Sequence, residues 1–359
     1  MESKKIHYFQ ILLALLSPLL SCTPKSESGA GERLPDTLHV LTLDTFPINS
    51  SIRALEAADD STTWFAGSGG VYGYTENGGG HWVIDSMQAD SIRPHFRSIA
   101  VTREAVFLLS IASPALLYRS ENKGKSWQLV YREDHPAAFY DAMAFWNDKE
   151  GIAIGDPTEG CLSVILTRDG GLNWEKISCR NLPAAMEGEA AFAASNTNIA
   201  LSGNHAWVVS GGKKARVFHS PDKGATWEVS DPPIIEGEQM TGIFSVDFYD
   251  ENQGIIFGGD WNRKEMNSRN KAVTTDGGRN WQLVSDGKGP GYRSCVQYIP
   301  GFNGKGILAC GTPGISYSLD GGANWSSLTT EAFYTFRFGK SWKTVWLAGD
   351  GKIGRMVLE

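Results

Sequence analysis

Hydrophobic and polar positions alternate along this chain in short segments, a pattern typical of half-buried β-strands and not of helices. Seven segments share this alternation around a small or apolar centre, and a second β-rich run follows each of them some ten to twenty residues later. In all units but one that second run ends in glycine. The seven segments are Ile52–Glu56, Phe96–Ala100, Tyr140–Ala144, Ala190–Ala194, Ile243–Asp247, Tyr292–Val296 and Phe333–Arg337. We expect each to be the first of four strands in a repeated unit.

A second motif recurs between these strands and marks where a hairpin turns. It reads Ser or Thr, any residue, Asp or Asn, any residue, Gly, two further residues and Trp, and we call it the Asp box. Six copies are present: Thr75–Trp82, Ser120–Trp127, Thr167–Trp174, Ser220–Trp227, Thr274–Trp281 and Ser318–Trp325. Their tryptophans are separated by 45, 47, 53, 54 and 44 residues, the spacing of a unit with about four short strands. The acidic or amide side chain suits bonds to nearby backbone N–H groups, and glycine suits a positive φ. Because six equivalent turns cannot converge on one site, we interpret the boxes as structural and not as catalytic or metal-binding.

Together the repeats predict an all-β protein, a seven-bladed β-propeller of four-stranded antiparallel blades over residues 37–359. The last unit, Phe333–Leu358, supplies only three strands before the chain ends. The one unassigned strand-like segment is Leu38–Leu43. We expect it to pair with Ile353–Leu358, which would close the ring in the last blade and cover an otherwise exposed sheet edge.

Composition supports this fold class and restricts the partners. The 359 residues include 41 glycines and 12 tryptophans, which suit tight turns and large aromatic wedges between sheets. The net charge of −7 argues against nucleic acid or an anionic bilayer surface as the main partner, because both attract a basic face.

The N-terminus carries an export pattern. Lys4 and Lys5 precede an apolar run that is too short to span a bilayer as a mature helix. The run ends in Leu-Leu-Ser-Cys, which resembles a bacterial lipobox, so residues 1–21 are predicted to be a signal peptide and Cys22 the lipidated first residue. Ordinary secretion with cleavage near the same point is the alternative. Residues 22–36, rich in Ser, Gly, Glu and Pro, are predicted to be a flexible tether.

Two family resemblances follow from these residues. The Asp boxes resemble the repeats of sialidases and related propellers. The chain from Leu38 to Leu358 is more similar to bacterial homologues of the photosystem II stability and assembly factor, and Phe139–Gly155 and Gly242–Gly259 are among the stretches that carry this similarity. The resemblance implies a propeller that binds or chaperones protein partners.

Candidate chemistry gathers at the end of the predicted channel where the innermost strands begin, opposite the Asp boxes. Aligning the inner strands and the loops beside them places arginines, carboxylates and tyrosines on one rim. The predicted rim consists of Arg53, Arg97, Tyr140, Asp141, Asp156, Glu187, Glu189, Glu238, Asp260, Tyr292, Arg293 and Tyr334. We interpret it as a surface that binds a protein segment or an anionic ligand.

Two other readings of the rim stay open. In the first, Arg53, Arg97 and Arg293 grip a carboxylate, as an arginine trio does in a sialidase-like glycoside hydrolase. The sialidase signature Phe-Arg-Ile-Pro is absent, however, because the corresponding stretch reads Ser-Ile-Arg-Ala at residues 51–54. In the second, arginines and carboxylates only pin neighbouring blades together.

Cysteines and histidines add little further chemistry. Cys161 and Cys179 are almost symmetric about one Asp-box turn and are expected to face each other, so an oxidising compartment makes a disulfide plausible. Cys295 and Cys310 are expected on adjacent strands, where they either pair or remain thiols. The seven histidines are scattered, and we expect no metal. No dinucleotide fingerprint follows a strand and opens a helix, so no cofactor is expected.

The sequence therefore predicts an exported, monomeric propeller, lipid-anchored to a bacterial membrane. Its expected function is that of a non-catalytic protein-binding or scaffold factor with a protein or peptide partner in the cell envelope. A sialidase-like or other glycan-active protein is the alternative.

Overall fold

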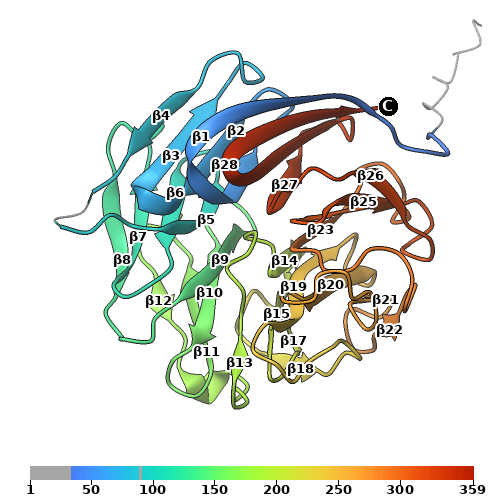
Figure 1. Cartoon of the computed structure of the whole chain (residues 1–359). Coiled ribbons are helices and arrows are strands. Elements are labelled where there is room, and N and C mark those ends of the chain that lie inside the picture. Colours follow the sequence, from blue (N-terminus) through green and yellow to red (C-terminus); the bar gives the residue numbers. More distant parts are fainter. Residues whose placement is uncertain (1–33, 89–90) are drawn as a thin grey trace, which may run out of the picture. The chain divides into compact units, whose positions relative to one another are not determined.

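Antiparallel strands make up nearly all the regular structure of this computed structural model, which describes residues 34–88 and 91–359. In that part of the chain the strands form six sheets, four of them four-stranded and two six-stranded. Figure 1 shows the sheets succeeding one another around a common centre, so the fold is an all-β β-propeller. Helical structure in the same residues is confined to the 3₁₀ turns η1 (Ser68–Gly70) and η2 (Cys179–Asn181), and no described helix is long and apolar enough to span a membrane.

The four-stranded sheets follow the order of the chain. The first contains β5 (Phe96–Val101), β6 (Val106–Ser110), β7 (Ala115–Ser120) and β8 (Gln128–Glu133). The second contains β9 (Tyr140–Phe145), β10 (Gly151–Pro157), β11 (Leu162–Thr167) and β12 (Glu175–Lys176). The third contains β14 (Ile199–Ser202), β15 (His205–Val209), β17 (Val217–Ser220) and β18 (Glu228–Ser230). The fourth contains β23 (Cys295–Tyr298), β24 (Ile307–Gly311), β25 (Gly314–Ser318) and β26 (Ser326–Thr329).

The two six-stranded sheets each join strands from distant parts of the chain. One has the order β27 (Thr335–Phe338), β28 (Thr344–Leu358), β1 (Val40–Ala57), β2 (Thr63–Gly67), β3 (Val71–Thr75) and β4 (Val83–Ser86). The other has the order β13 (Glu189–Ala190), β16 (Gly211–Gly212), β19 (Thr241–Phe248), β20 (Gly254–Asp260), β21 (Lys271–Thr274) and β22 (Gln282–Leu283).

The prediction of seven blades is wrong, because the propeller has six sheets. The cause lies in β1, which is one continuous strand of 18 residues and not a short closing strand. Its first half pairs with β28, with Val40 opposite Leu358 and Phe46 opposite Ile353, and its second half pairs with β2. The last repeat of the sequence therefore shares a sheet with the first (Figure 1). The repeat counts strands along the chain, whereas the number of sheets depends on which strands bond to each other.

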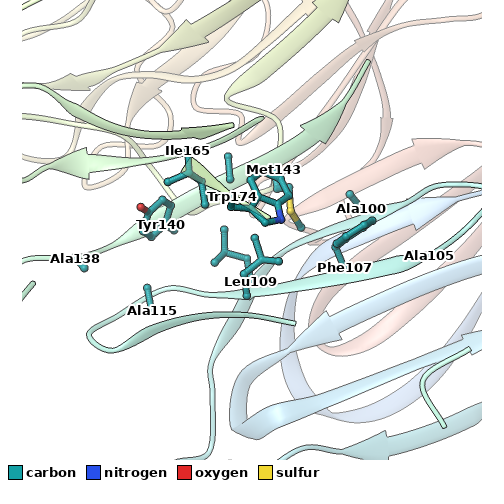
Figure 2. Close-up of a cluster of buried hydrophobic side chains, with 12 residues drawn as sticks. Ala100, Ala105, Phe107, Leu109, Ala115, Ala138, Tyr140, Met143, Ile165 and Trp174 are labelled. Atoms are coloured by element: carbon teal, nitrogen blue, oxygen red, sulfur yellow. The ribbon is translucent and has the colours of Figure 1, made fainter. Parts of the chain in front are cut away.

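The hydrophobic core lies mainly between neighbouring sheets. Figure 2 shows one such cluster, in which Phe107 of β6, Ile165 of β11 and Trp174 of an Asp box pack together. The ring centroids of Phe107 and Trp174 lie 6.5 Å apart with an edge-to-face tilt. Burying one such large side chain contributes roughly 1.5–3 kcal/mol, so the repeated tryptophans contribute to holding successive sheets together.

Each Asp box forms the turn into the last strand of its unit, with the same local bonds. In the copy at Ser220–Trp227, the Ser220 hydroxyl accepts from the Gly224 amide at 2.7 Å and Asp222 Oδ1 accepts from the Thr226 amide at 2.8 Å. The fifth-position glycine has a φ between 74° and 92° in all six copies, a conformation that favours glycine. The boxes are therefore self-contained turns.

Candidate functional site

A cavity of about 370 Å³ opens at the end of the propeller where the first strands of the sheets begin, opposite the Asp-box turns. Its walls come from β1, β5, β10 and β19, from residues 190–194, from the segments before β9, β19 and β23, and from the residue after β20. The lining residues are Arg53, Arg97, Phe139, Asp156, Ala190, Ala191, Phe192, Ala193, Ala194, Gln239, Met240, Phe244, Trp261 and Tyr292. The cavity thus combines an apolar wall with two guanidinium groups.

One face of this cavity is a segment of irregular backbone, residues 190–194. The sequence predicted an inner strand here, and that prediction is wrong: only Glu189 and Ala190 form a strand, β13, which pairs with β16. The innermost strand of the corresponding sheet is β14, which begins at Ile199. The backbone of residues 191–194 does not pair in a sheet, because its amide and carbonyl groups bond to side chains of other sheets, among them Asp156 and Arg97.

Residues 195–197 continue this segment into the centre of the propeller. Asn196 donates to the Ile99 carbonyl of β5 at 2.9 Å and accepts from the Met143 amide of β9 at 3.0 Å. Ser195 accepts at its carbonyl from the Thr335 hydroxyl of β27 at 2.8 Å. One short segment therefore bonds to three different sheets, each through a residue more than 50 positions away in the sequence, which anchors the face of the cavity.

Arg53 and Arg97 lie on the cavity wall and donate to this same segment. The Nη1 atom of Arg53 lies 3.4 Å from the Ala194 carbonyl, and Nη1 of Arg97 lies 3.4 Å from the Ala193 carbonyl. The guanidinium of Arg53 also stacks 3.8 Å above the Tyr334 ring. Burial, together with the neighbouring charge of Arg53, lowers the pKa of Arg97 to about 10, and burial lowers the pKa of Arg53 as well. Both side chains stay charged at neutral pH.

Two carboxyl groups lie beneath the same segment. Asp156 Oδ1 accepts from the Ala191 amide at 2.8 Å and lines the cavity. Burial raises the pKa of Asp156 to about 6. Asp141 is fully buried, and neither of its carboxylate oxygens has a hydrogen bond of good geometry among the described residues. Burial and the adjacent Asp156 raise its pKa well above the usual range, although the amides of Ala193 and Asp156 and the charge of Arg97 oppose the rise.

An aromatic cluster forms the apolar wall of the cavity. The rings of Phe192 and Phe244 stack with centroids 3.9 Å apart. Tyr292 meets Phe244 edge-on at 4.8 Å and Trp261 at 5.3 Å. Such a wall suits an apolar or aromatic side chain of a ligand.

The structure brings four residues of the predicted rim into this cavity, and it places the others elsewhere. Arg53, Arg97, Asp156 and Tyr292 line the cavity. Asp141 lies behind it and Tyr334 lies under Arg53. Tyr140 is fully buried in the core cluster of Figure 2, with its hydroxyl 3.3 Å from that of Tyr131.

The remaining rim residues serve local contacts. The side chains of Glu187 and Glu238 are 92% and 67% exposed and reach Lys213 and Arg263 respectively. Asp260 accepts from the backbone amide and the guanidinium of Arg263. Burial alone would raise the pKa of Asp260, but these bonds outweigh burial and the pKa is lowered. Arg293 points away from Arg53 and Arg97 and lines a different cavity. The arginine trio of a sialidase-like site is therefore not brought together.

Sequence reasoning missed much of the apolar wall. Phe139, Phe192, Gln239, Met240 and Trp261 line the cavity but were absent from the predicted rim. Phe192 stands alone among four alanines, and Trp261 directly follows Asp260 of the predicted rim. Large apolar residues in such loops were the available signal.

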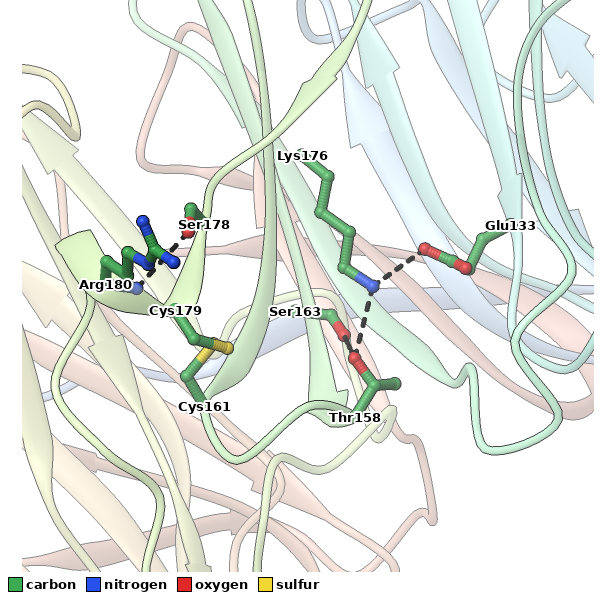
Figure 3. Close-up of a disulfide and its surroundings, with 8 residues drawn as sticks. All are labelled: Glu133, Thr158, Cys161, Ser163, Lys176, Ser178, Cys179 and Arg180. Atoms are coloured by element: carbon green, nitrogen blue, oxygen red, sulfur yellow. Dashed lines mark hydrogen bonds and ion pairs between the residues drawn. A yellow bond between two sulfur atoms is a disulfide. The ribbon is translucent and has the colours of Figure 1, made fainter.

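A disulfide and a buried ion pair stabilise the chain just before residues 190–194. Cys161 and Cys179 are joined in a disulfide, with Cα atoms 5.5 Å apart (Figure 3). Farther along, Arg216 donates to Glu189 at 2.9 and 2.5 Å and to the Ala184 carbonyl at 2.8 Å. The side chain of Glu189 is fully buried, and it also accepts from the Ser210 hydroxyl at 2.6 Å. Glu189 is thus a structural anchor directly before the cavity segment.

The predictions for the N-terminus, the two remaining cysteines and metal ligands concern residues outside the first cavity. Residues 1–21, Cys22 and most of the tether lie outside the described residues. Cys295 and Cys310 are directly opposite on β23 and β24, and both are buried free thiols. Residues 34–88 and 91–359 contain no group of three or more His, Cys, Asp or Glu side chains that could hold a metal ion.

Comparisons with known proteins identify the fold but no family. Neither a protein-family model nor a curated protein matches the chain. A solved structure of YCF48 bound to D1 peptide is similar, with a TM-score of 0.62, 16% identity, and coverage of 89% of this chain and 99% of that one. YCF48 from Cyanidioschyzon merolae matches with a TM-score of 0.61 and 13% identity, over 88% of this chain and 98% of that one. The Pan2 WD40 domain of Neurospora crassa matches equally well, at 0.61 and 13%, over 89% and 95%. These similarities support the propeller fold.

Proposed function

We propose that this protein is a non-catalytic binding or assembly factor that holds a segment of a partner protein in the cavity at residues 190–194. The observation that carries the proposal is the pairing of an aromatic wall with Arg53 and Arg97, for neither of which the described residues supply an ion pair. A carboxylate beside an apolar side chain is the ligand chemistry that such a surface recognises. The peptide held by one YCF48 structure of the same fold adds support.

The proposal includes the setting predicted from the N-terminus. An exported, monomeric protein, lipid-anchored through Cys22, would present this cavity to segments of envelope proteins. The sialidase-like alternative loses its main support, because Arg293 lies in another cavity. A protein-binding role needs only the surface that Arg53, Arg97 and the aromatic wall provide.

The test is a pull-down from membranes with the native anchor retained. Captured partners are identified and then measured against the variants Arg97→Gln and Trp261→Ala, both on the cavity wall. Arg279→Gln is the matched control, because Arg279 is exposed at an Asp-box turn on the opposite end. We expect each cavity variant to weaken partner affinity about tenfold or more, which is the scale of a lost charged or aromatic anchor, and the control to leave it unchanged.

Two results would contradict the proposal. Partner affinity that is the same in Arg97→Gln, Trp261→Ala and the wild type would place binding on another surface. Turnover of a fluorogenic sialoside or uronide that disappears in Arg97→Gln would instead make the cavity an enzyme site.

A further inference from the structure

A second cavity of about 370 Å³ lies on the other side of the segment that enters β23. Tyr292 lines the first cavity, whereas Arg293, the next residue, lines the second. The walls are formed by the long connection between β20 and β21, the segment before β23 and the turn between β24 and β25. The lining residues are Lys264, Glu265, Gly291, Arg293, Thr312 and Pro313.

Arg293 is a buried cation without a counter-charge. Its residue exposure is 6%, and no carboxylate of the described residues is among the groups that shift its pKa. Nη1 donates to the Tyr292 carbonyl at 2.8 Å and Nη2 donates to the Ser316 hydroxyl at 2.9 Å, while Nε has no partner among the described residues. Burial lowers the pKa of Arg293 to about 10, so the group stays charged at neutral pH. A buried charge that only neutral groups solvate is costly, and an anion would offset that cost.

The surroundings of Arg293 add positive potential. Lys271 is 1% exposed and close enough to Arg293 for the two charges to repel, and its ammonium bonds only to the Asn270 side chain and the Lys288 carbonyl. Lys264, on the cavity wall, holds its ammonium 4.1 Å above the Trp261 ring. The buried Thr312 hydroxyl on the opposite wall has no partner among the described residues.

Nearby acidic groups are engaged outside the cavity. Glu265 contributes to the wall, but it is exposed and its charge acts on Arg263. Asp286 accepts from the Arg269 amide at 2.6 Å, and its charge acts on Lys271, which is not part of the cavity lining. Two cationic side chains, Arg293 and Lys264, and an unpartnered hydroxyl therefore line the second cavity, and Lys271 lies close to Arg293. The net charge of the protein is −7.

We propose that the second cavity is an oxyanion-binding site in which Arg293 and Thr312 are the principal donors and Lys264 supplies charge. The oxyanion is either a free ion such as phosphate or the carboxylate of an acidic polypeptide, since a guanidinium offers parallel N–H groups to both. The site is separate from the first cavity, and it does not rest on the proposed function.

The test measures inorganic phosphate binding to the full-length protein by isothermal titration calorimetry, with sodium chloride at equal ionic strength as the background. Arg293→Gln removes the guanidinium, and Thr312→Val removes the hydroxyl at nearly constant volume. Arg279→Gln at the opposite end is the control. We expect saturable phosphate binding that weakens at least about tenfold in Arg293→Gln and severalfold in Thr312→Val, with no change in the control. Far-ultraviolet circular dichroism checks that each variant is folded, and Thr312→Val decides the matter if Arg293→Gln does not fold.

A second arm separates the two sources of the oxyanion. Hexaglutamate and hexaglutamine peptides are titrated into the same proteins. Hexaglutamate binding that is lost in the variants, with hexaglutamine inert, assigns the site to acidic polypeptide, whereas phosphate binding alone assigns it to a free ion. The proposal is overturned if phosphate and hexaglutamate both fail to bind above the chloride background. It is also overturned if their affinities are equal in the wild type and in every folded variant. Neither outcome bears on the Arg97 and Trp261 tests of the first cavity.

Discussion

The two ends of this propeller use carboxyl groups in opposite ways. At the Asp-box end, Asp222 bonds to the amide and hydroxyl of Thr226, four residues away. Slight burial opposes ionisation there, but these bonds outweigh it and lower the pKa of Asp222. At the cavity end, Asp156 bonds to the amide of Ala191, 35 residues away, and burial raises its pKa to about 6. Local bonds therefore favour the ionised form of the turn carboxylate, whereas burial by distant parts of the chain disfavours ionisation of Asp156.

The largest effect is expected from the anchor of the cavity segment. Glu189→Ala would leave the Arg216 guanidinium buried without its partner, since the side chains of the pair are 0% and 8% exposed. We expect the free energy of unfolding to fall by about 3–5 kcal/mol in chemical denaturation. The exposed Glu187→Ala is the matched control, with an expected change near zero. Equal changes in the free energy of unfolding for the two variants would contradict a structural role of the buried Glu189–Arg216 pair.

A medium effect is expected from the pH dependence at the cavity end. The pKa of Asp156 is about 6 in the folded protein, against about 4 in an unfolded chain. Its contribution to stability is therefore fully present below pH 4 and is lost as the pH rises through 6. Asp156→Asn keeps an oxygen acceptor for the Ala191 amide and removes this titration.

The measurement is denaturant unfolding of both proteins between pH 4 and pH 7. We expect the stability of the wild type, relative to Asp156→Asn, to fall by about 2 kcal/mol over that range. A difference that stays constant, or one that grows with pH in favour of the wild type, would contradict a buried acid at this position.

The smallest effect is expected at a single Asp box. Asp222→Ala removes three hydrogen bonds at an exposed turn, from the Ser220 hydroxyl and from the amide and hydroxyl of Thr226, so we expect a loss of about 1 kcal/mol at pH 7. Because the pKa of Asp222 is lowered, this contribution is present above pH 4 and disappears as the pH falls below it. Asp276→Ala, at the equivalent turn, should behave alike in the same titration. Partner affinity that changes in either variant would give the Asp boxes a role beyond structure.

Much of the architecture could be predicted from the sequence, because strand alternation and turn bonds involve residues close together in the chain. The Asp boxes predicted the hairpin turns, because each turn is made by bonds within five residues, as in Ser220–Gly224. The closing contact was readable too, since Leu38–Leu43 was the one unpaired strand pattern left, and Val40–Pro47 does lie along β28. The number of blades was not readable, because alternation cannot tell whether β1 ends after one sheet or continues into the next.

The residues of the candidate site were also only partly predictable from the sequence. Arg53, Arg97, Asp156 and Tyr292 could be predicted from equivalent positions on the inner strands and loops. Arg293 occupies the position equivalent to Arg53 and Arg97, yet it enters a second cavity because its guanidinium bonds to Ser316. Residues 190–194 carry a strand pattern, but groups of other sheets bind their backbone.

Local sequence patterns predicted most of the strands, the turns that join them and the residue types gathered at one end of the propeller. These follow from alternation, from glycine at positive φ and from side chains that bond a few residues away. The tertiary structure sets how many sheets form and which arginines share a cavity. It also causes the burial that raises the pKa of Asp156 to about 6, whereas turn bonds lower the pKa of Asp222. The reason is physical: strand patterns and turn bonds are local, whereas burial and the charge around a group depend on contacts between residues far apart in the chain.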